Sequence, residues 1–323
     1  MILTTSDPVC IARDPAALEA EWSELARTRA QPTVFLTPDW IGVARAHDHR
    51  PQITASIDSR GVAALALEDN GAFSFAGGEL TDYQDVVARP QDVAQVATAL
   101  GGWIAERGAP VRMKFVPEES GTVEAMSASL DAAGYDVAID RLVTSPRVEL
   151  PDSFEAYLQS LGGKKRHELR RKLRRLEAGR RIAFRFASSR EQTSAVDRFM
   201  ALHRMSRGEK AQFMTPEVER FFRDVADAMA ARGWLRLGVL SVDGDDSAVL
   251  FGFAYEGILS VYNAAYDPAL ASVSVGIASQ AYAIRSAIAD GLRTYDLLRG
   301  GERFKYDLGA IDHWLLRLDA SRP

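Results

Sequence analysis

The segment SVSVGIASQAYAIRSAIADG (272–291) has the pattern of a helix that begins directly after an extended run. Apolar residues recur at helical spacing from Ile277 to Ile288, and Gly291 provides a C-terminal stop. Asp-Gly and Glu-Gly dipeptides, typical of tight hairpins, separate three strand-like runs that precede this helix: WLRLGVLSV (234–242), AVLFGFAY (248–255) and ILSVYNAAY (258–266). The sequence therefore predicts an antiparallel meander followed by a helix.

The start of this predicted helix has the features of an anion site. Val275, Gly276, Ile277, Ala278 and Ser279 form a strand-to-helix turn. Unpaired N–H groups and the positive end of the helix dipole attract phosphate there, and small residues allow a diphosphate to approach closely. We predict that these residues bind the diphosphate of coenzyme A, the alternative being an ordinary turn that favours glycine. Rossmann and P-loop glycine motifs are absent.

Charged residues surround a glycine turn further along the chain. TYDLL (294–298) predicts a strand, RGGERFK (299–305) predicts a turn, and IDHWLLRLD (311–319) predicts a final strand. The charged side chains are Asp296, Arg299, Glu302 and Lys305. An acid and a base within one turn can orient an amine, move a proton or bind an anion. The alternative is a surface turn with an ordinary ion pair.

A basic segment contrasts with the net charge of −5. Residues 164–181 hold ten Lys and Arg residues against Glu168 and Glu177, a local charge of +8. This pattern predicts either the solvated face of an amphipathic helix or contact with phosphates, such as the coenzyme 3′-phosphate, an anionic substrate or a membrane surface. No aromatic residues interleave with these charges, which argues against a nucleic-acid partner.

The N-terminal half repeats much of this element order. Three strand-like runs are followed by a helix near 91–107, a strand, a helix near 120–133 and a last strand; the strands are ITASID (53–58), VAALALE (62–68), AFSFAG (72–77), VRMKFV (111–116) and YDVAIDRLV (135–143). We therefore expect an α+β (mixed α/β) fold with two related domains, 1–145 and 146–323, each with a mostly antiparallel central sheet flanked by helices.

Composition excludes several classes of protein. Of 323 residues, 47% are hydrophobic and 26% are charged, which is typical of soluble globular proteins rather than disordered or collagen-like chains. The single cysteine, Cys10, excludes a disulfide framework, and the five histidines show no metal-ligand spacing, so we expect no metal. No apolar run is long enough to span a membrane, and residues 1–14 lack a signal-peptide pattern, so we expect a cytoplasmic protein.

Taken in order, seven segments resemble the GNAT superfamily, in particular the CelD/BcsL-type acetyltransferase-like branch related to the Fem (FemAB-type) aminoacyltransferases. They are FLTPDW (35–40), LTDYQDVV (80–87), GGKKRHELRRKLRRLE (162–177), FMALHRMSR (199–207), VYNAAYDP (261–268), SVGIASQAYAIRSAIADG (274–291) and YDLLRGGERFK (295–305). The resemblance implies tandem GNAT-like domains with a cleft between them and acyl transfer to an amine.

As donor, the resemblance implies acyl-CoA, with an acetyl or longer chain, and as acceptor an amino sugar, a polysaccharide precursor or a lipid amine such as a long-chain base. The closing motif in relatives often reads R-G-D-E-x-Y-K, whereas this chain has Gly301 and Phe304 at the Asp and Tyr positions. Lys305 matches the lysine that Fem-type relatives place at the reacting centre. Basic residues 164–181 would suit peripheral contact with the inner membrane surface.

The GNAT pattern implies that the thioester lies between the strands at 258–266 and 294–298, where a neutral amine attacks it. Glu302, Asp296, Tyr262 or His203 could take the proton of the amine through water. Candidate substrate-binding residues are Asp82, Tyr83, Arg204 and Arg299. Two alternatives stay open: a Fem-like transferase that uses aminoacyl-tRNA, and a non-catalytic binding or regulatory module.

Overall fold

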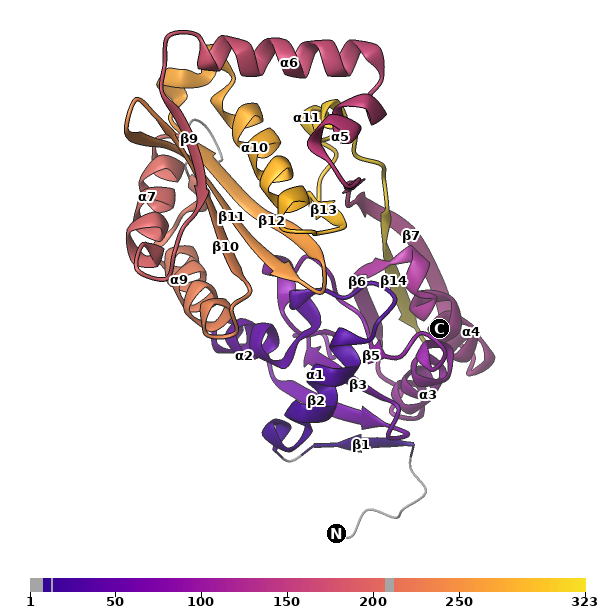
Figure 1. The fold of residues 1–323 in the computed structure, drawn as a ribbon. Helices are drawn as coiled ribbons and strands as arrows, with labels where there is room; N and C mark the ends of the chain where they lie inside the picture. Colours follow the sequence, from indigo (N-terminus) through magenta and orange to yellow (C-terminus); the bar gives the residue numbers. More distant parts are fainter. Residues whose placement is uncertain (1–7, 13, 207–211) are drawn as a thin grey trace. The chain divides into compact units, whose positions relative to one another are not determined.

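Two compact units make up the chain (Figure 1). The computed structural model describes residues 8–12, 14–206 and 212–323. Unit 1 comprises residues 1–144 and 313–323, and unit 2 comprises residues 145–312. The structure thus differs from the expected domains 1–145 and 146–323, because the last strand returns to unit 1. Residues 1–7, which belong to the stretch without a signal-peptide pattern, lie outside the described residues.

Unit 2 is built on a six-stranded sheet with the order β8-β13-β12-β11-β10-β9, counted over the described residues. Its strands are β8 (Arg147–Glu149), β9 (Ile182–Phe186), β10 (Leu235–Val242), β11 (Asp245–Tyr255), β12 (Ile258–Tyr266) and β13 (Thr294–Asp296). Strands β10, β11 and β12 form the antiparallel meander that the sequence predicts, and β9 pairs antiparallel with β10. Asp243 and Glu256 have φ of 55° and 47°, which fits the expected tight hairpin turns.

The pairing of β12 with β13 is parallel and short. Ile258, Leu259 and Ser260 face Thr294, Tyr295 and Asp296 in register, and the ladder ends there. Strand β12 continues for six more residues, to Tyr266, whereas the chain after β13 leaves the sheet. The two strands therefore part beyond Ser260 and Asp296, and the ladder between them does not continue along the rest of β12.

Helices cover both faces of this sheet (Figure 1). Helices α7 and α9 pack on one face, and α10 packs on the other beside α5 and α6. Helix α11, at 303–307, occupies the second half of the stretch that the sequence predicts as a glycine turn (299–305). Their bounds are α5 (Phe154–Ser160), α6 (Gly163–Glu177), α7 (Gln192–Arg204), α9 (Pro216–Ala231), α10 (Val275–Ala289) and α11 (Arg303–Asp307).

Unit 1 has a second mostly antiparallel sheet, with the order β1-β2-β3-β4-β6-β14-β7 and with β5 paired to β3. Its strands are β1 (Val9–Ile11), β2 (Gln52–Ile57), β3 (Gly61–Leu67), β4 (Phe73–Phe75), β5 (Val87–Ala88), β6 (Val111–Pro117), β7 (Asp136–Thr144) and β14 (Trp314–Ser321). Its helices are α1 (Glu19–Arg27), α2 (Pro38–Ala46), α3 (Val93–Glu106) and α4 (Thr122–Ala132). The α+β class with two mostly antiparallel sheets is therefore confirmed.

The two units repeat one pattern. In unit 1, β2, β3 and β4 form a meander, α3 follows, and β6 returns parallel to β4 with Phe73 facing Val111. In unit 2, β10, β11, β12, α10 and β13 have the same order. In each sheet an antiparallel strand from a remote part of the sequence then pairs with the returning strand: β14 with β6, and β8 with β13.

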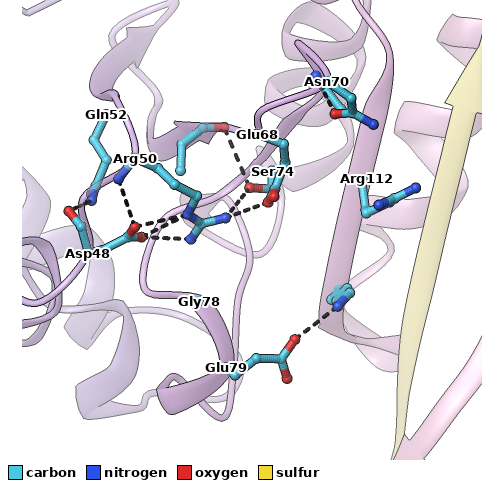
Figure 2. A network of polar contacts seen from close by, with 12 residues as sticks. Asp48, Arg50, Gln52, Glu68, Asn70, Ser74, Gly78, Glu79 and Arg112 are labelled. Atoms are coloured by element: carbon cyan, nitrogen blue, oxygen red, sulfur yellow. Dashed lines mark hydrogen bonds and ion pairs between the residues drawn. The ribbon is translucent and has the colours of Figure 1, made fainter. Parts of the chain in front are cut away.

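A network of polar side chains in unit 1 centres on Arg50 (Figure 2). Arg50 donates to Asp48 at 2.6 and 2.9 Å and to Ser74 at 3.2 Å, and it also pairs with Glu68. Burial raises the pKa of Asp48, but the hydrogen bonds and the charge of Arg50 outweigh burial and hold this pKa below its ordinary value. This network ties the segment before β2 to β3 and β4.

Candidate functional site

Helix α10 begins without a side-chain cap among the described residues. Its N-cap residue, Ser274, has φ 62°, and its side chain makes no hydrogen bond to the first turn. The N–H groups of Ile277 and Ala278 donate to the carbonyl of Ser274 at 3.1 and 3.0 Å. The N–H groups of Val275 and Gly276 precede these bonds and form the outermost donors of the helix.

The side chains of the expected phosphate-binding turn mostly face inward. Val275 and Ala278 are fully buried, and Ser279 is 1% exposed with its hydroxyl donating to the carbonyl of Gly276 at 2.8 Å. A Cβ on Gly276 would lie 2.9 Å from the ring of Tyr266, so glycine allows this ring to cover the turn. Any ligand at this turn would therefore meet backbone N–H groups and Tyr266.

A cation from the basic segment reaches the same helix end. Arg175, near the end of α6, donates from Nη2 to the hydroxyl of Ser274 at 2.8 Å. Sequence reasoning identified the helix start and the basic segment separately but missed this contact, because 99 residues separate the two side chains. The positive end of the α10 dipole and a guanidinium thus reinforce each other at one place.

The rest of α6 is an amphipathic helix. Leu169, Leu173 and Leu176 are buried in the core of unit 2, while the basic residues lie outside it. Arg171 hydrogen-bonds Glu168 at 2.8 Å and thereby lowers the pKa of that exposed carboxyl to about 2. Most of α6 therefore fits the interpretation of its basic residues as the solvated face of an amphipathic helix. Arg175 is different, because it contacts the start of α10.

Asp296 lies at the point where β12 and β13 part. It is 3% exposed, and its Oδ1 accepts a hydrogen bond from the N–H of Leu298 at 2.9 Å. Its Oδ2 is 3.5 Å from Nε of Arg147, in β8. Leu298 has φ 57°, so the chain turns sharply here. These contacts fit a residue that shapes the turn, and no sequence pattern pointed to Arg147.

Lys305 is a buried cation that holds the loop after β13. Its ammonium donates to the carbonyls of Leu298, Arg299 and Gly300 at 2.9, 2.8 and 2.9 Å. The carboxylate of Glu302 lies 3.0 Å away. Since the three carbonyls use the three N–H groups of an ammonium, Lys305 is suited to fixing the loop rather than to accepting a proton.

Glu302 is the exposed member of this cluster. Its side chain is 58% exposed, compared with 4% for Lys305. Gly300 has φ 110°, and a Cβ there would lie 2.5 Å from Oε2 of Glu302, so only glycine allows the carboxylate to approach. Among the candidates in this loop, Glu302 alone combines a carboxylate with access to solvent, the combination that a base acting through water needs.

Tyr262 and His203 lie in an aromatic cluster with α7 and α9. The ring of Tyr262 is 5.4 Å from that of Phe222, and His203 is 1% exposed with its ring 5.7 Å from that of Phe199. Tyr262 is the extra residue of a bulge, because the register of β12 on β11 shifts around it. The structure therefore places both residues against apolar rings of one aromatic cluster.

The remaining candidates are dispersed. Asp82 and Tyr83 belong to unit 1, where they are 7% and 3% exposed, and the ring of Tyr83 lies 5.9 Å from that of Phe35. Arg204 pairs with Glu219 of α9. Nothing in these contacts assigns a substrate to the three residues.

Two features are absent from the part of the chain that the structure describes. No group of three or more His, Cys, Asp or Glu side chains there is arranged to hold a metal ion. No helix in that part is both long and apolar enough to cross a membrane.

Comparison with known proteins supports one family. Residues 163–306 match the model of the acetyltransferase (GNAT) domain. This segment contains α6, the meander, α10, β13 and the Lys305 loop. Residues 163–306 are therefore similar to a GNAT domain, and the expected resemblance to the GNAT superfamily is confirmed. No curated protein sequence matches the chain.

Three solved structures share the fold of nearly the whole chain. A conserved protein of unknown function from Bacteroides thetaiotaomicron is 14% identical with a TM-score of 0.67, covering 97% of this chain and 100% of that chain. FemX is 11% identical with a TM-score of 0.65, covering 93% and 95%. The C-terminal domain of a putative lysylphosphatidylglycerol synthetase from Agrobacterium fabrum is 11% identical with a TM-score of 0.61, covering 94% and 92%.

Proposed function

We propose that this protein is an N-acyltransferase that moves an acyl group from acyl-CoA to an amine. The observation that carries the proposal is the start of α10, where N–H groups without a side-chain cap and Arg175 together favour a diphosphate. The GNAT family model supports the same class of reaction. The phosphates of the donor would bind Val275, Gly276, Ile277, Ala278 and Ser279 through the backbone, with Arg175 as the cation.

The thioester of the donor would enter where β12 and β13 part, beyond Ser260 and Asp296. Backbone N–H groups of β12 beyond the end of this ladder could stabilise the oxyanion. A neutral amine attacks the thioester carbon, the C–N bond forms, the C–S bond breaks and the thiolate leaves. Glu302 accepts the amine proton through water, because it is the exposed carboxylate of the adjacent loop.

The other candidates have different parts in this proposal. Lys305 and Asp296 are positioning residues that hold the loop carrying Glu302. Arg299 lies in the same loop and could bind the acceptor. Tyr262 and His203, grouped with aromatic rings, could contact an apolar part of the acceptor.

The acceptor is an amine of an amino sugar, a polysaccharide precursor or a lipid. The location we propose is the cytoplasm, with contact to the inner membrane surface through residues 164–181 if the acceptor is a lipid. Exposed cations of α6 support this option. Sedimentation with vesicles of anionic lipid, compared with neutral vesicles, tests it.

The first experiment is a thermal-shift titration with acetyl-CoA, a long-chain acyl-CoA and free CoA. A ligand that binds only the native state raises the melting temperature by mass action. Arg175→Ala should weaken binding about ten-fold, the usual size of one lost charge-assisted hydrogen bond. Arg171→Ala, on the same helix but paired with Glu168, is the matched control and should bind normally. No shift with any of these ligands on folded protein would reject the proposal.

A second candidate is transfer from aminoacyl-tRNA, and the observation that favours it is the density of exposed cations on α6. The fold that the chain shares with FemX is compatible with it. Retention of tRNA that falls steeply with salt would favour this donor. A third alternative, a non-catalytic binding module, predicts ligand binding without release of free CoA or tRNA at any acceptor concentration.

A further inference from the structure

A buried ion pair lies at the point where β12 and β13 part. Nε of Arg147, the first residue of β8, is 3.5 Å from Oδ2 of Asp296, and the two side chains are 9% and 5% exposed. The reaction proposed above gives a part to Asp296 but none to Arg147. We infer that Arg147 is a positioning residue for this reaction, an inference that rests on the proposed function. Arg147 acts through Asp296 and Lys305 on the carboxylate of Glu302.

The backbone of Arg147 has a partner on each side. Its N–H donates to the carbonyl of Ile311 at 3.0 Å, and its carbonyl accepts from the N–H of Ile311 at 2.8 Å. On the other side, β8 pairs antiparallel with β13, and Arg147 lies directly opposite Asp296. Side chains of directly opposite residues share one face of the sheet. The guanidinium therefore reaches the carboxylate from a backbone position that is fixed by both neighbours.

The carboxylate of Asp296 connects Arg147 to the turn that follows β13. Oδ2 faces the guanidinium, while Oδ1 accepts the N–H of Leu298 at 2.9 Å. Because each oxygen has a partner, rotation of the carboxylate is restricted. Leu298 has φ 57°, a conformation that leucine rarely adopts and that persists only where surrounding contacts hold it. The hydrogen bond to Asp296 is one of these contacts, and Arg147 holds its acceptor in place.

The same turn leads to Glu302 through Lys305. The carbonyl of Leu298 accepts from Nζ of Lys305 at 2.9 Å, and this ammonium lies 3.0 Å from Oε2 of Glu302. Leu298 thus bonds to Asp296 through its N–H and to Lys305 through its carbonyl. A rotation of Asp296 would turn Leu298 and displace the ammonium that pairs with Glu302. Since Glu302 is the proposed base, such a displacement would slow the chemical step.

Stability alone does not explain an ion pair at this position. The cost of burying two charges offsets much of their attraction, so two apolar side chains of similar volume often stabilise a protein as well or better. An apolar pair would provide neither an acceptor for the N–H of Leu298 nor a contact that fixes the direction of this acceptor. Orientation of the turn is what the charged pair of Arg147 and Asp296 adds.

Hydrogen exchange without any substrate tests whether Arg147 holds the loop. Arg147→Met should speed exchange of the amides in residues 297–305 several-fold, and by more than it changes exchange in β11. Arg29→Met is the matched control, because it removes an equally buried arginine that pairs with an aspartate in unit 1. Unchanged exchange in residues 297–305, or an equal change in Arg29→Met, would overturn the inference.

Kinetics test whether the loop position matters for the reaction. The assay follows release of CoA from the acyl-CoA that binds best, with glucosamine or sphinganine as the amine. Arg147→Met should lower kcat about 10- to 100-fold and leave KM for acyl-CoA nearly unchanged, because the donor would bind at the start of α10. Arg147→Lys, which keeps the charge, should recover most of kcat. An equal loss of kcat in Arg29→Met, or a change in KM alone, would overturn the inference.

A double variant keeps the test independent of folding. If Arg147→Met does not fold, Arg147→Met/Asp296→Asn removes the uncompensated charge and keeps an Oδ1 acceptor for Leu298. It should fold and show the same loss of kcat, and a kcat equal to that of the parent would overturn the inference. A parent protein that releases no CoA would count against the proposed function itself, and hydrogen exchange would then still decide whether Arg147 holds the loop.

Discussion

Arg50 in unit 1 and Lys305 in unit 2 both hold segments that connect strands, but their partners differ. Arg50 bonds to side chains, namely Asp48, Glu68 and Ser74, and its side chain is 23% exposed (Figure 2). Lys305 is 4% exposed and bonds to three successive backbone carbonyls. Side-chain partners can change rotamer, whereas carbonyl partners fix the path of the chain itself. The loop whose backbone path is fixed in this way therefore lies in unit 2, the unit that carries the proposed chemistry.

The helices that follow the two meanders differ in the charge found at their N-terminal ends. In unit 1, the N-cap residue of α3 is the acidic Asp92, which pairs with Arg60. In unit 2, the N-cap residue of α10 is Ser274, which accepts from Arg175. One helix start therefore carries an added anion and the other an added cation, although the order of elements is the same. Only the second suits a diphosphate.

The largest expected effect comes from removing the two cations. Lys305→Ala leaves three carbonyls, one buried and two partly buried, without their donor and should lower the free energy of unfolding of unit 2 by about 3 kcal/mol. Arg50→Ala should cost about 1 kcal/mol in unit 1, because its partners are partly exposed. Hydrogen exchange in rising urea, read from peptides of each unit, measures both. Equal losses would contradict the difference between the two cations.

Glu302→Gln should affect turnover rather than folding. The carboxylate is exposed, so the melting temperature should change little, but loss of a general base should lower kcat about 100-fold. Steady-state release of CoA measures kcat, and Glu217→Gln on α9 is a control at a similarly exposed glutamate. A parallel loss of melting temperature and activity would show that Glu302, like Lys305, only holds the loop.

A glycine-to-alanine pair compares the helices of the two units. Gly42, inside α2, has no neighbouring atom within 4 Å of the position that a Cβ would take, so Gly42→Ala should stabilise unit 1 by about 0.5–1 kcal/mol. Gly276→Ala should not stabilise unit 2 in this way, because the added Cβ would lie 2.9 Å from the ring of Tyr266. It should also weaken acyl-CoA binding. Urea unfolding of both variants checks the first prediction, and stabilisation of equal size would contradict it.

The smallest expected effect is on the stability of unit 2 at acidic pH. Glu191, the N-cap residue of α7, accepts hydrogen bonds from the N–H and hydroxyl of Ser188 and from Arg185, in that order of effect, and its pKa falls to about 2. Its folded-state pKa lies below the unfolded value of about 4.5, so its contribution is present above pH 4.5 and is lost as pH falls toward 2.

Glu191→Gln should therefore remove part of the loss of stability between about pH 4.5 and 2 in unit 2 and leave unit 1 unchanged. Thermal unfolding at several pH values in this window, with hydrogen exchange to separate the units, measures it. An acid response identical to that of the parent protein would show that the network around Glu191 has no influence on stability.

Local sequence pattern predicted most of the elements. Hairpin dipeptides identified the meander of unit 2, and apolar spacing identified α10, because both depend on neighbouring residues. The three-residue strand Arg147–Glu149 and the helix at 303–307 were missed, since each is too short for a periodic pattern. The destination of β14 was also missed, because pairing between distant segments leaves no local sign.

The candidate site was predicted in pieces rather than as an arrangement. The helix start at 275–279 and the loop around Lys305 were found from residue types, and their functional roles stay predictions. The contacts of Arg175 with Ser274 and of Arg147 with Asp296 depend on tertiary structure. Sequence could show that the charges exist but not which of them meet.

The position of β14 has a consequence for how the chain is made. This strand pairs with β6 on one side and β7 on the other, so it is an interior strand of the unit 1 sheet. During synthesis on the ribosome, all of unit 2 emerges before β14 does. Until then β6 and β7 are both without this partner, although they were translated long before. Unit 1, first to be translated, is therefore the last to be completed.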